Sequence, residues 1–139
     1  MKRVLFICTH NAGRSQMAEG YLRARYGDRY EAFSAGTVAS TVSPLTVRVM
    51  SELGIDISDQ RSKDLDAFID TEMDVVVTVC DAAAAACPMF PGAKRTIHAS
   101  FPDPGAATGT DEERLAAFRS VRDEIAAWID ASFGGAAPL

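Results

Sequence analysis

The stretch that decides the fold is Cys8-Thr9-His10-Asn11-Ala12-Gly13-Arg14-Ser15. It follows a short apolar run, Val4-Leu5-Phe6-Ile7, which predicts a buried parallel strand, and it leads into residues 16–22, which predict a helix. A loop that leaves a strand and enters a helix directs several backbone N–H groups at one point. Together with the helix dipole, these donors favour an anion there. We therefore expect an anion-binding loop over residues 8–15.

The field of such a loop also stabilises a thiolate, so Cys8 is expected to be the nucleophile. Arg14 offers a planar fork to a tetrahedral oxyanion, and Ser15 offers a hydroxyl directed back at the sulfur. The residues expected to bind the substrate are Thr9, His10, Asn11, Ala12, Gly13, Arg14 and Ser15. Within this set, Asn11 is expected to hold the shape of the loop and His10 to lie at its rim. The alternative is that Cys8 is only a small buried hydrophobe at a strand end.

The composition limits the classes of protein that are possible. A length of 139 residues fits one domain, residues 1–139, and 47% hydrophobic with 24% charged residues is ordinary for a soluble protein. The formal charge of −5 argues against a nucleic-acid partner. No apolar run reaches the length of a membrane span, and the run after Met1-Lys2-Arg3 is too short for a signal peptide. We expect a cytoplasmic protein.

The chain has three cysteines, Cys8, Cys80 and Cys87. An odd number in a chain without a recognisable leader argues against a static disulfide framework. Their spacing fits no zinc site, so no metal is predicted. Reactive thiols are the better interpretation.

Strand-like and helix-like patterns alternate along the chain. Strands are predicted over 3–7, 30–34, 74–79 and 94–99, and helices over 16–26, 44–53, 64–69, 81–87 and from Thr110 onward. This order predicts an α/β three-layer sandwich, with a four-stranded parallel sheet and helices on both faces. Ligands in such folds bind outside the carboxyl ends of the strands, so Cys8, Cys80 and the Asp103 loop are expected to meet there.

The helical periodicity also assigns some side chains to the core or to the surface. Leu65, Phe68 and Ile69 are expected to face the core from the short helix. Arg114, Arg119 and Arg122 fall away from the apolar stripe of the last helix and are expected to face solvent. His98 is expected to be a structural histidine in the last strand.

A tetrahedral oxyanion in the loop leaves two reactions open. In one, Cys8 attacks a phosphate monoester, and a carboxylic acid protonates the departing alcohol. In the other, Cys8 attacks arsenate, and further thiols supply the electrons that reduce arsenic. The other cysteines favour the second reaction, because a phosphatase needs only one thiol. Asp103, before Pro104 in a loop, is the candidate acid, and its alternative role is to cap a turn.

Cys80 and Cys87 permit an electron relay by thiol–disulfide exchange. Cys80 would attack the arsenylated Cys8 and leave a Cys8–Cys80 disulfide, and Cys87 would then attack Cys80 and free Cys8. An intact helix between Cys80 and Cys87 would hold the two thiols about 10 Å apart. Bonded cysteines need Cα atoms within roughly 7 Å, so the segment is expected to unwind or loop out. The alternative is that Cys80 and Cys87 are buried core residues.

Taken together, these residues resemble the thioredoxin-coupled arsenate reductases, which share the low-molecular-weight tyrosine phosphatase fold. The resemblance rests on residues 8–20, on Val79-Cys80 through Cys87-Pro88, and on Asp103-Pro104. It implies catalytic roles for Cys8, Arg14, Cys80, Cys87 and Asp103. It also implies arsenate as substrate, arsenite as product and thioredoxin as reductant, with no bound cofactor and a monomeric protein.

Departures from the family's pattern bear on ion binding. Some relatives bind potassium near the Asn of this loop, and Asn11, Glu19 and Ser34 match that site. Lys63 stands where a carboxylate ligand would be expected, and its ammonium could replace the ion, so no potassium is predicted.

Departures elsewhere bear on the loop and on the reaction. Many relatives have Gly at the position of His10 and Ser-Cys at Ala12-Gly13. Phosphatases of this fold usually carry Tyr after Asp-Pro, where this chain has Gly105. Two alternatives remain beside the reductase: a low-molecular-weight tyrosine phosphatase, and a non-enzymatic module that binds oxyanions or senses redox state.

Overall fold

The computed structural model describes residues 1–86, 90–135 and 138–139. Within these residues, four strands form one sheet in the order β2-β1-β3-β4, and every neighbouring pair is parallel. The strands are β1 (Lys2–Cys8), β2 (Tyr30–Gly36), β3 (Val75–Thr78) and β4 (Thr96–His98). The predicted parallel sheet is therefore confirmed.

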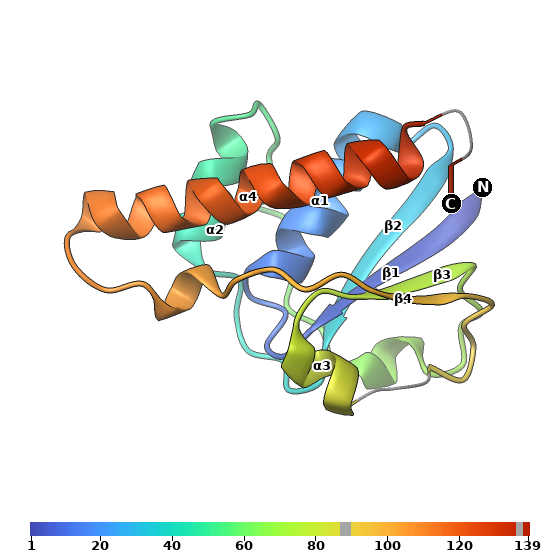
Figure 1. Ribbon diagram of the computed structural model, residues 1–139. Helices are drawn as coiled ribbons and strands as arrows, with labels where there is room; N and C mark the ends of the chain where they lie inside the picture. The colour runs from blue at the N-terminus through green and yellow to red at the C-terminus, as the bar shows by residue number, and fades with distance from the viewer. Residues whose placement is uncertain (87–89, 136–137) are drawn as a thin grey trace.

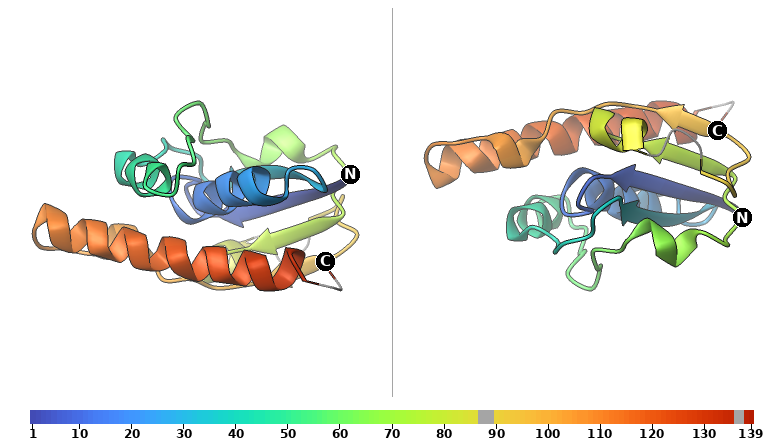
Figure 2. Two further views of the ribbon diagram at one scale, coloured as in Figure 1. Left: turned by 90° about the horizontal axis from the view of Figure 1, so that it is seen from above. Right: turned by 90° about the horizontal axis from the view of Figure 1, so that it is seen from below.

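Helices cover both faces of this sheet (Figures 1 and 2). On one face lie α1 (Arg14–Tyr26), α2 (Pro44–Ser51) and the long α4 (Asp111–Phe133). On the other face lie α3 (Asp81–Ala86) and the short 3₁₀ turn η1 (Leu65–Phe68). A second 3₁₀ turn, η2 (Pro104–Ala106), connects β4 to α4. The predicted three-layer sandwich is confirmed.

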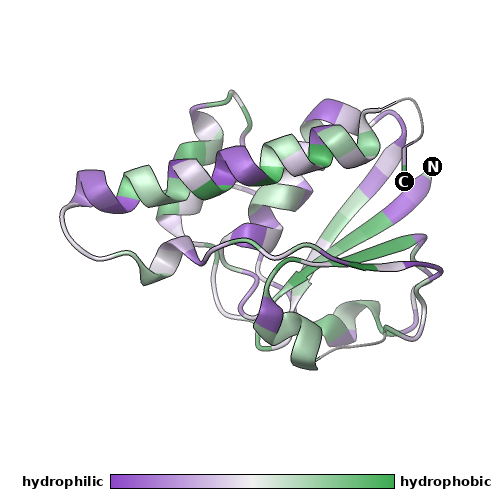
Figure 3. Ribbon diagram, viewed as in Figure 1, coloured by the Kyte–Doolittle hydropathy of each residue, from purple (hydrophilic) through white to green (hydrophobic). Residues whose placement is uncertain are grey.

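Strands β1 and β3 form because their apolar runs are covered on both faces. All residues of Val4–Ile7 are 0% exposed, and Val75–Val77 are also buried. The hydrophobic colour along β1 and β3 in Figure 3 follows these runs. Such continuous runs are typical of central parallel strands. Strand β4 is shorter than predicted, because it is an edge strand that pairs only with β3.

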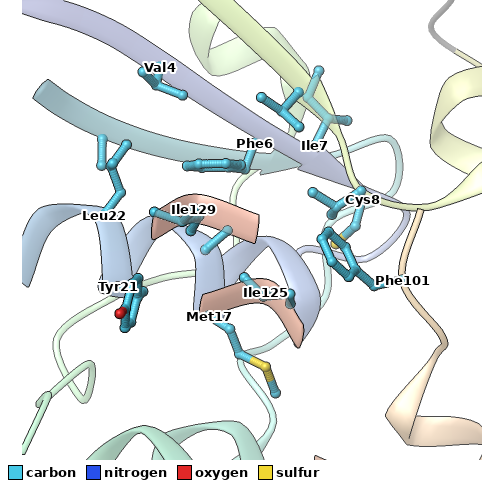
Figure 4. Packing of buried hydrophobic residues seen from close by; sticks show 14 of the residues in the cluster. Val4, Phe6, Ile7, Cys8, Met17, Tyr21, Leu22, Phe101, Ile125 and Ile129 are labelled. Atoms are coloured by element: carbon cyan, nitrogen blue, oxygen red, sulfur yellow. The ribbon is translucent and has the colours of Figure 1, made fainter. Parts of the chain in front are cut away.

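The core lies mainly between the sheet and the helices α1 and α4. Phe6 points from β1 toward Leu22 of α1 and Ile129 of α4 (Figure 4). Its ring meets Phe133 edge to face at a centroid distance of 6.4 Å. Full burial of each large apolar side chain stabilises the fold by roughly 1.5–3 kcal/mol. This packing fixes α1 against β1 and thereby fixes both ends of the connecting loop.

The register of the sheet places the ends of its strands at one edge. Cys8 pairs with Gly36 at the ends of β1 and β2, and Thr78 pairs with His98 at the ends of β3 and β4. Cys80 follows β3 by only two residues. The carboxyl edge of the sheet therefore gathers both cysteines that the structure describes, as the sequence predicts.

Two side chains depart from the surface and core assignments. Ile69 is 47% exposed rather than buried, because η1 ends at Phe68. Arg122 does not face solvent: its side chain is 11% exposed and lies between α4 and α2. Its Nη1 donates to the carbonyl of Val49 at 2.9 Å and to Glu52 Oε1 at 2.8 Å. No helix in the described ranges has both the length and the apolar character to cross a membrane.

The ion pairs of Glu52 make the contact between α2 and α4 sensitive to acid. Hydrogen bonds from Arg119, and then from Arg122, lower the pKa of the Glu52 carboxyl from 4.5 to about 2. A carboxyl with a lowered pKa stabilises the fold above its ordinary pKa, and this contribution is lost as the pH falls toward the lowered value. We expect Glu52→Gln to lower the melting temperature at pH 7 and to converge with the wild type between pH 4.5 and pH 2.

Thermal unfolding followed by circular dichroism across this pH range tests the expectation. Glu124→Gln is the control, because Glu124 is an exposed carboxylate on α4, the helix that carries Arg119 and Arg122. A Glu52→Gln deficit that stays constant down to pH 2 would contradict the role of the ion pairs.

Candidate active site

The loop between β1 and α1 has the backbone of an anion site. Cys8 ends β1, Arg14 begins α1, and Gly13 at the N-cap makes no side-chain cap. Among the described residues, none accepts a hydrogen bond from the backbone N–H groups of residues 9–13. These donors and the first turn of α1 therefore remain available to a ligand with negative charge.

Cys8 is buried at the base of this loop, with 3% of its surface exposed. Its Sγ lies 2.8 Å from Ser15 Oγ. Asn11 Nδ2 donates to the same Ser15 oxygen at 2.7 Å. Since the amide nitrogen can only donate, the hydroxyl hydrogen of Ser15 is free to point at the sulfur. This arrangement suits a thiolate, and it brings together three residues that the sequence predicts.

Asn11 fixes the curvature of the loop. It has a φ of 52°, in the left-handed region that Asn tolerates better than most residues, and it is 0% exposed. Its Oδ1 accepts hydrogen bonds from Gln16 Nε2 and from the backbone N–H of Lys63, both at 2.8 Å. Gln16 also donates to the carbonyl of Asn11 at 3.0 Å. The predicted shape-holding position of Asn11 is observed, and Gln16 is a supporting residue that the sequence reasoning did not identify.

Gly36, at the end of β2, is a second residue that the sequence reasoning missed. A Cβ at this position would lie 2.6 Å from the carbonyl oxygen of Thr9 and 2.9 Å from the backbone nitrogen of Asn11. Gly13 differs, because a Cβ there would make only an ordinary contact, 3.6 Å from Thr46 Oγ1. The strand β2 therefore approaches the loop as closely as a glycine permits.

This close approach predicts unequal effects for two similar substitutions. Gly36→Ala forces the loop backbone to move, and we expect it to lower kcat/KM by about tenfold or more, the equivalent of roughly 1–3 kcal/mol of strain. We expect Gly13→Ala to stay within about threefold of the wild type, since its methyl group meets no backbone. Steady-state kinetics of both variants, with circular dichroism to verify folding, compare them. Equal activities would contradict the steric role of Gly36.

Glu19, the one carboxylate among the residues matched to a potassium site, is already paired with cations of the chain. The Glu19 carboxylate is nearly buried, and it lies 2.8 Å from Arg23 Nη2 and 3.5 Å from Lys63 Nζ. The hydroxyl of Ser34 donates to Glu19 Oε1 as well. A monovalent ion here would add a further positive charge beside the two basic groups that already share this one carboxylate. The residues present therefore do not fit a potassium ion.

Cys80 lies next to the loop, two residues after the end of the neighbouring strand β3. It is also 3% exposed, and its Sγ is 3.6 Å from Thr9 Oγ1. A cavity of about 560 Å³ opens beside it. The residues that line this cavity are Arg14, Cys80, Asp81, Ala82, Ser100, Phe101 and Pro102. Arg14 Nη1 donates to the carbonyl of Phe101 at 3.0 Å, so the predicted oxyanion contact and the second thiol share one cavity.

The remaining predicted residues are more peripheral. Asp103 is exposed, its carboxylate accepts a hydrogen bond from Gly105 N at 2.9 Å, and it is not among the described residues that line the cavity. It therefore caps η2, which was the alternative role. His10 is exposed at the rim, where its Nδ1 lies 3.1 Å from the carbonyl of Val38. Cys87 lies outside the described residues.

Comparison with known proteins finds relatives of this chain by sequence and by structure. The family model described as low molecular weight phosphotyrosine protein phosphatase matches residues 3–132. An arsenate reductase from Halalkalibacterium halodurans is 48% identical over 124 residues, which is 89% of this chain and 89% of that protein. A solved arsenate reductase in a phosphate-binding state superposes with a TM-score of 0.81 at 31% identity, covering 94% of this chain and 95% of that chain.

One further solved structure is a thioredoxin-dependent arsenate reductase from Corynebacterium glutamicum. It superposes with a TM-score of 0.65 at 32% identity and covers 94% of this chain but 61% of that longer chain.

Proposed function

Because this chain belongs to the low molecular weight phosphotyrosine protein phosphatase family and groups there with arsenate reductases, we propose that it reduces arsenate to arsenite by a three-cysteine relay that thioredoxin regenerates. The observation that carries the proposal is a second buried thiol beside the anion-binding loop. Cys8 and Cys80 are each 3% exposed, and Thr9 contacts Cys80 from the loop itself. Hydrolysis of a phosphate ester has no use for this second thiol.

The first half of the reaction forms a bond between sulfur and arsenic. Arsenate lies on the backbone N–H groups of residues 9–13 and on the guanidinium of Arg14. The Cys8 thiolate attacks arsenic, an S–As bond forms, and an As–O bond breaks as the departing oxygen takes up a proton and leaves as water. We assign this proton to Asp103, whose carboxyl group must first turn away from Gly105 N.

The second half transfers electrons by disulfide exchange. The Cys80 thiolate attacks Cys8 Sγ, an S–S bond forms, and the electron pair of the broken S–As bond remains on arsenic, which leaves as arsenite. The Cys87 thiolate then attacks Cys80 Sγ, and Cys8 departs as a thiolate ready for the next arsenate. The dithiol of thioredoxin reduces the Cys80–Cys87 disulfide by the same exchange and is itself oxidised.

Burial explains why a third cysteine is needed. An external dithiol must reach a disulfide sulfur along the S–S axis, and both sulfurs of a Cys8–Cys80 disulfide would lie at positions that are 3% exposed. Moving the disulfide to Cys80–Cys87 takes it away from the loop. Support for thioredoxin as the partner comes from the thioredoxin-dependent relative of C. glutamicum. We place the reaction in the cytoplasm, where thioredoxin keeps thiols reduced, and assign it to a monomer.

The second candidate function is that of a tyrosine phosphatase. The matching family carries that name, and the loop of Cys8, Arg14 and Ser15 serves phosphate as well as arsenate. One feature favours the reductase: the position of the second thiol, Cys80, beside the loop. A module that binds oxyanions without turnover is the third candidate.

A coupled assay tests the proposal. The protein is mixed with arsenate, thioredoxin, thioredoxin reductase and NADPH, and both NADPH oxidation and arsenite are measured. A parallel reaction replaces thioredoxin by glutathione and glutaredoxin, and another offers an aryl phosphate. We expect sustained arsenite formation in the reaction with thioredoxin and not in the reaction with glutathione and glutaredoxin. Rapid hydrolysis of the aryl phosphate without arsenite formation would favour the phosphatase, and arsenate binding without turnover would favour the module.

A further inference from the structure

A hydrogen-bonded chain ties the first turn of α3 to the sheet, next to Cys80. His98, at the end of β4, lies 2.8 Å from Thr78 Oγ1 through Nδ1 and 2.8 Å from Asp81 Oδ1 through Nε2. Thr78 is buried at the end of β3, and Asp81 is the first residue of α3. The histidine therefore joins β3, β4 and α3 directly beside the second thiol.

This chain holds in both protonation states of His98. In the neutral ring, Nε2–H donates to the Asp81 carboxylate, and Nδ1 accepts the hydroxyl hydrogen of Thr78. In the protonated ring, Nδ1–H donates to Thr78, whose hydroxyl hydrogen turns toward the carbonyl of Ile97 at 3.5 Å. Either way, His98 keeps a donor on the Asp81 carboxylate.

Helix α3 has few other contacts that stabilise it. It contains six residues, and only Ala83 is buried. A helix of this length is not stable on its own in water. Its first turn is also capped by Cys80, whose Sγ accepts the backbone N–H of Ala83 at 3.4 Å. Once Cys80 becomes part of a disulfide, this sulfur is a weaker acceptor, and that end of α3 then depends more on the contact from His98 to Asp81 and on the backbone bond from Ala84 N–H to the Cys80 carbonyl.

We propose that His98 is a positioning residue that latches α3 in its helical form and opposes the second disulfide exchange. This inference rests on the proposed function. A helix that ran from Cys80 to Cys87 would hold the two Cα atoms about 10 Å apart, and a disulfide needs roughly 7 Å or less, so we expect the second exchange to require that α3 unwinds. The latch formed by Thr78, His98 and Asp81 therefore opposes the unwinding of α3 and slows the second exchange relative to the first.

The test resolves the two exchanges in time. Reduced protein is mixed with excess arsenate and quenched in acid, its thiols are alkylated, and mass spectrometry follows the Cys8–Cys80 and Cys80–Cys87 disulfides. In His98→Leu we expect the second exchange to accelerate by roughly two- to fivefold, the range for an exposed charge-assisted contact. We expect arsenite release in the first exchange to change by less than about twofold. His98→Gln, which keeps a donor near Nε2, is expected to restore the wild-type rates.

Hydrogen exchange in the reduced protein adds a readout that does not depend on arsenate. The Ala84 amide donates to the Cys80 carbonyl at 3.2 Å and should exchange faster in His98→Leu than in the wild type. Lys94→Met is the control, since it removes an exposed ion pair at the other end of β3 and β4, 3.4 Å from Lys94 Nζ to Asp74 Oδ1, without touching α3.

The outcomes separate the latch from the relay. If Cys80–Cys87 forms at the same rate in the wild type and in His98→Leu, with equal protection of Ala84, the latch is wrong and the relay stands. If the wild type never forms the Cys80–Cys87 disulfide, the relay is wrong, and the latch, which acts on the second exchange, is wrong as well. A faster second exchange that His98→Gln reverses and Lys94→Met does not share supports the latch.

Discussion

Cys8→Ser is expected to abolish arsenite formation, with a loss of more than about 10⁴-fold in rate, the scale seen when a covalent nucleophile is removed. A serine hydroxyl at the base of the loop is a far weaker nucleophile than a thiolate, and it cannot form the disulfide that supplies electrons to arsenic. The substitution replaces the Sγ atom by a hydroxyl oxygen and leaves the volume of the side chain nearly unchanged. The fold and the backbone of residues 9–13 should therefore persist.

The same variant should still bind oxyanions, because the N–H groups of the loop and Arg14 do not depend on the sulfur. Arsenate or phosphate should raise the melting temperature of Cys8→Ser as it does that of the wild type. Arsenite assays and thermal unfolding on one preparation make the comparison. Residual multi-turnover reduction by Cys8→Ser would show that another thiol attacks arsenate.

Arg14→Lys is expected to lower kcat/KM for arsenate by about 10²–10³-fold, as for removal of an oxyanion-binding donor. The guanidinium of Arg14 donates through Nη1 to the carbonyl of Phe101 at 3.0 Å, which orients its remaining N–H groups beside the cavity that contains Cys80. A lysine ammonium keeps the charge but loses the planar fork and cannot make both contacts in this geometry.

Single-turnover arsenite release under subsaturating arsenate measures this effect. Arg114→Lys is the matched control, because Arg114 is an exposed arginine on α4. Wild-type kinetics in Arg14→Lys would mean that the backbone alone holds the oxyanion.

Much of the fold could be predicted because the strongest signals are local. The apolar runs of β1 and β3 and the capping box of Thr110 and Glu113 at the start of α4 depend on neighbours in sequence. Arg122 could not be placed in this way. Its position on α4 is solvent-facing by helical periodicity, but a carboxylate and a carbonyl from α2 draw it inward.

The residues of the candidate site also divide into those fixed by neighbours in sequence and those placed by contacts between distant parts of the chain. The loop of Cys8, Arg14 and Ser15 could be predicted because strand, loop and helix are contiguous. The residues that support it come from elsewhere in the chain: Gly36 touches the loop from β2, and Lys63 reaches Asn11 across 52 positions of sequence. His98 is predicted to be a structural histidine, and both of its ring nitrogens have partners, but its partner Asp81 could not be predicted because the contact depends on the order of strands in the sheet.

The central claim is that a third cysteine carries the disulfide away from two buried thiols, and Cys87→Ser tests it most directly. With arsenate, thioredoxin, thioredoxin reductase and NADPH, we predict a single burst of arsenite, equal in amount to the enzyme. Mass spectrometry should then find the protein trapped with a Cys8–Cys80 disulfide, since both positions are only 3% exposed and we expect this burial to exclude thioredoxin. Continued turnover by Cys87→Ser at the wild-type rate would contradict the relay.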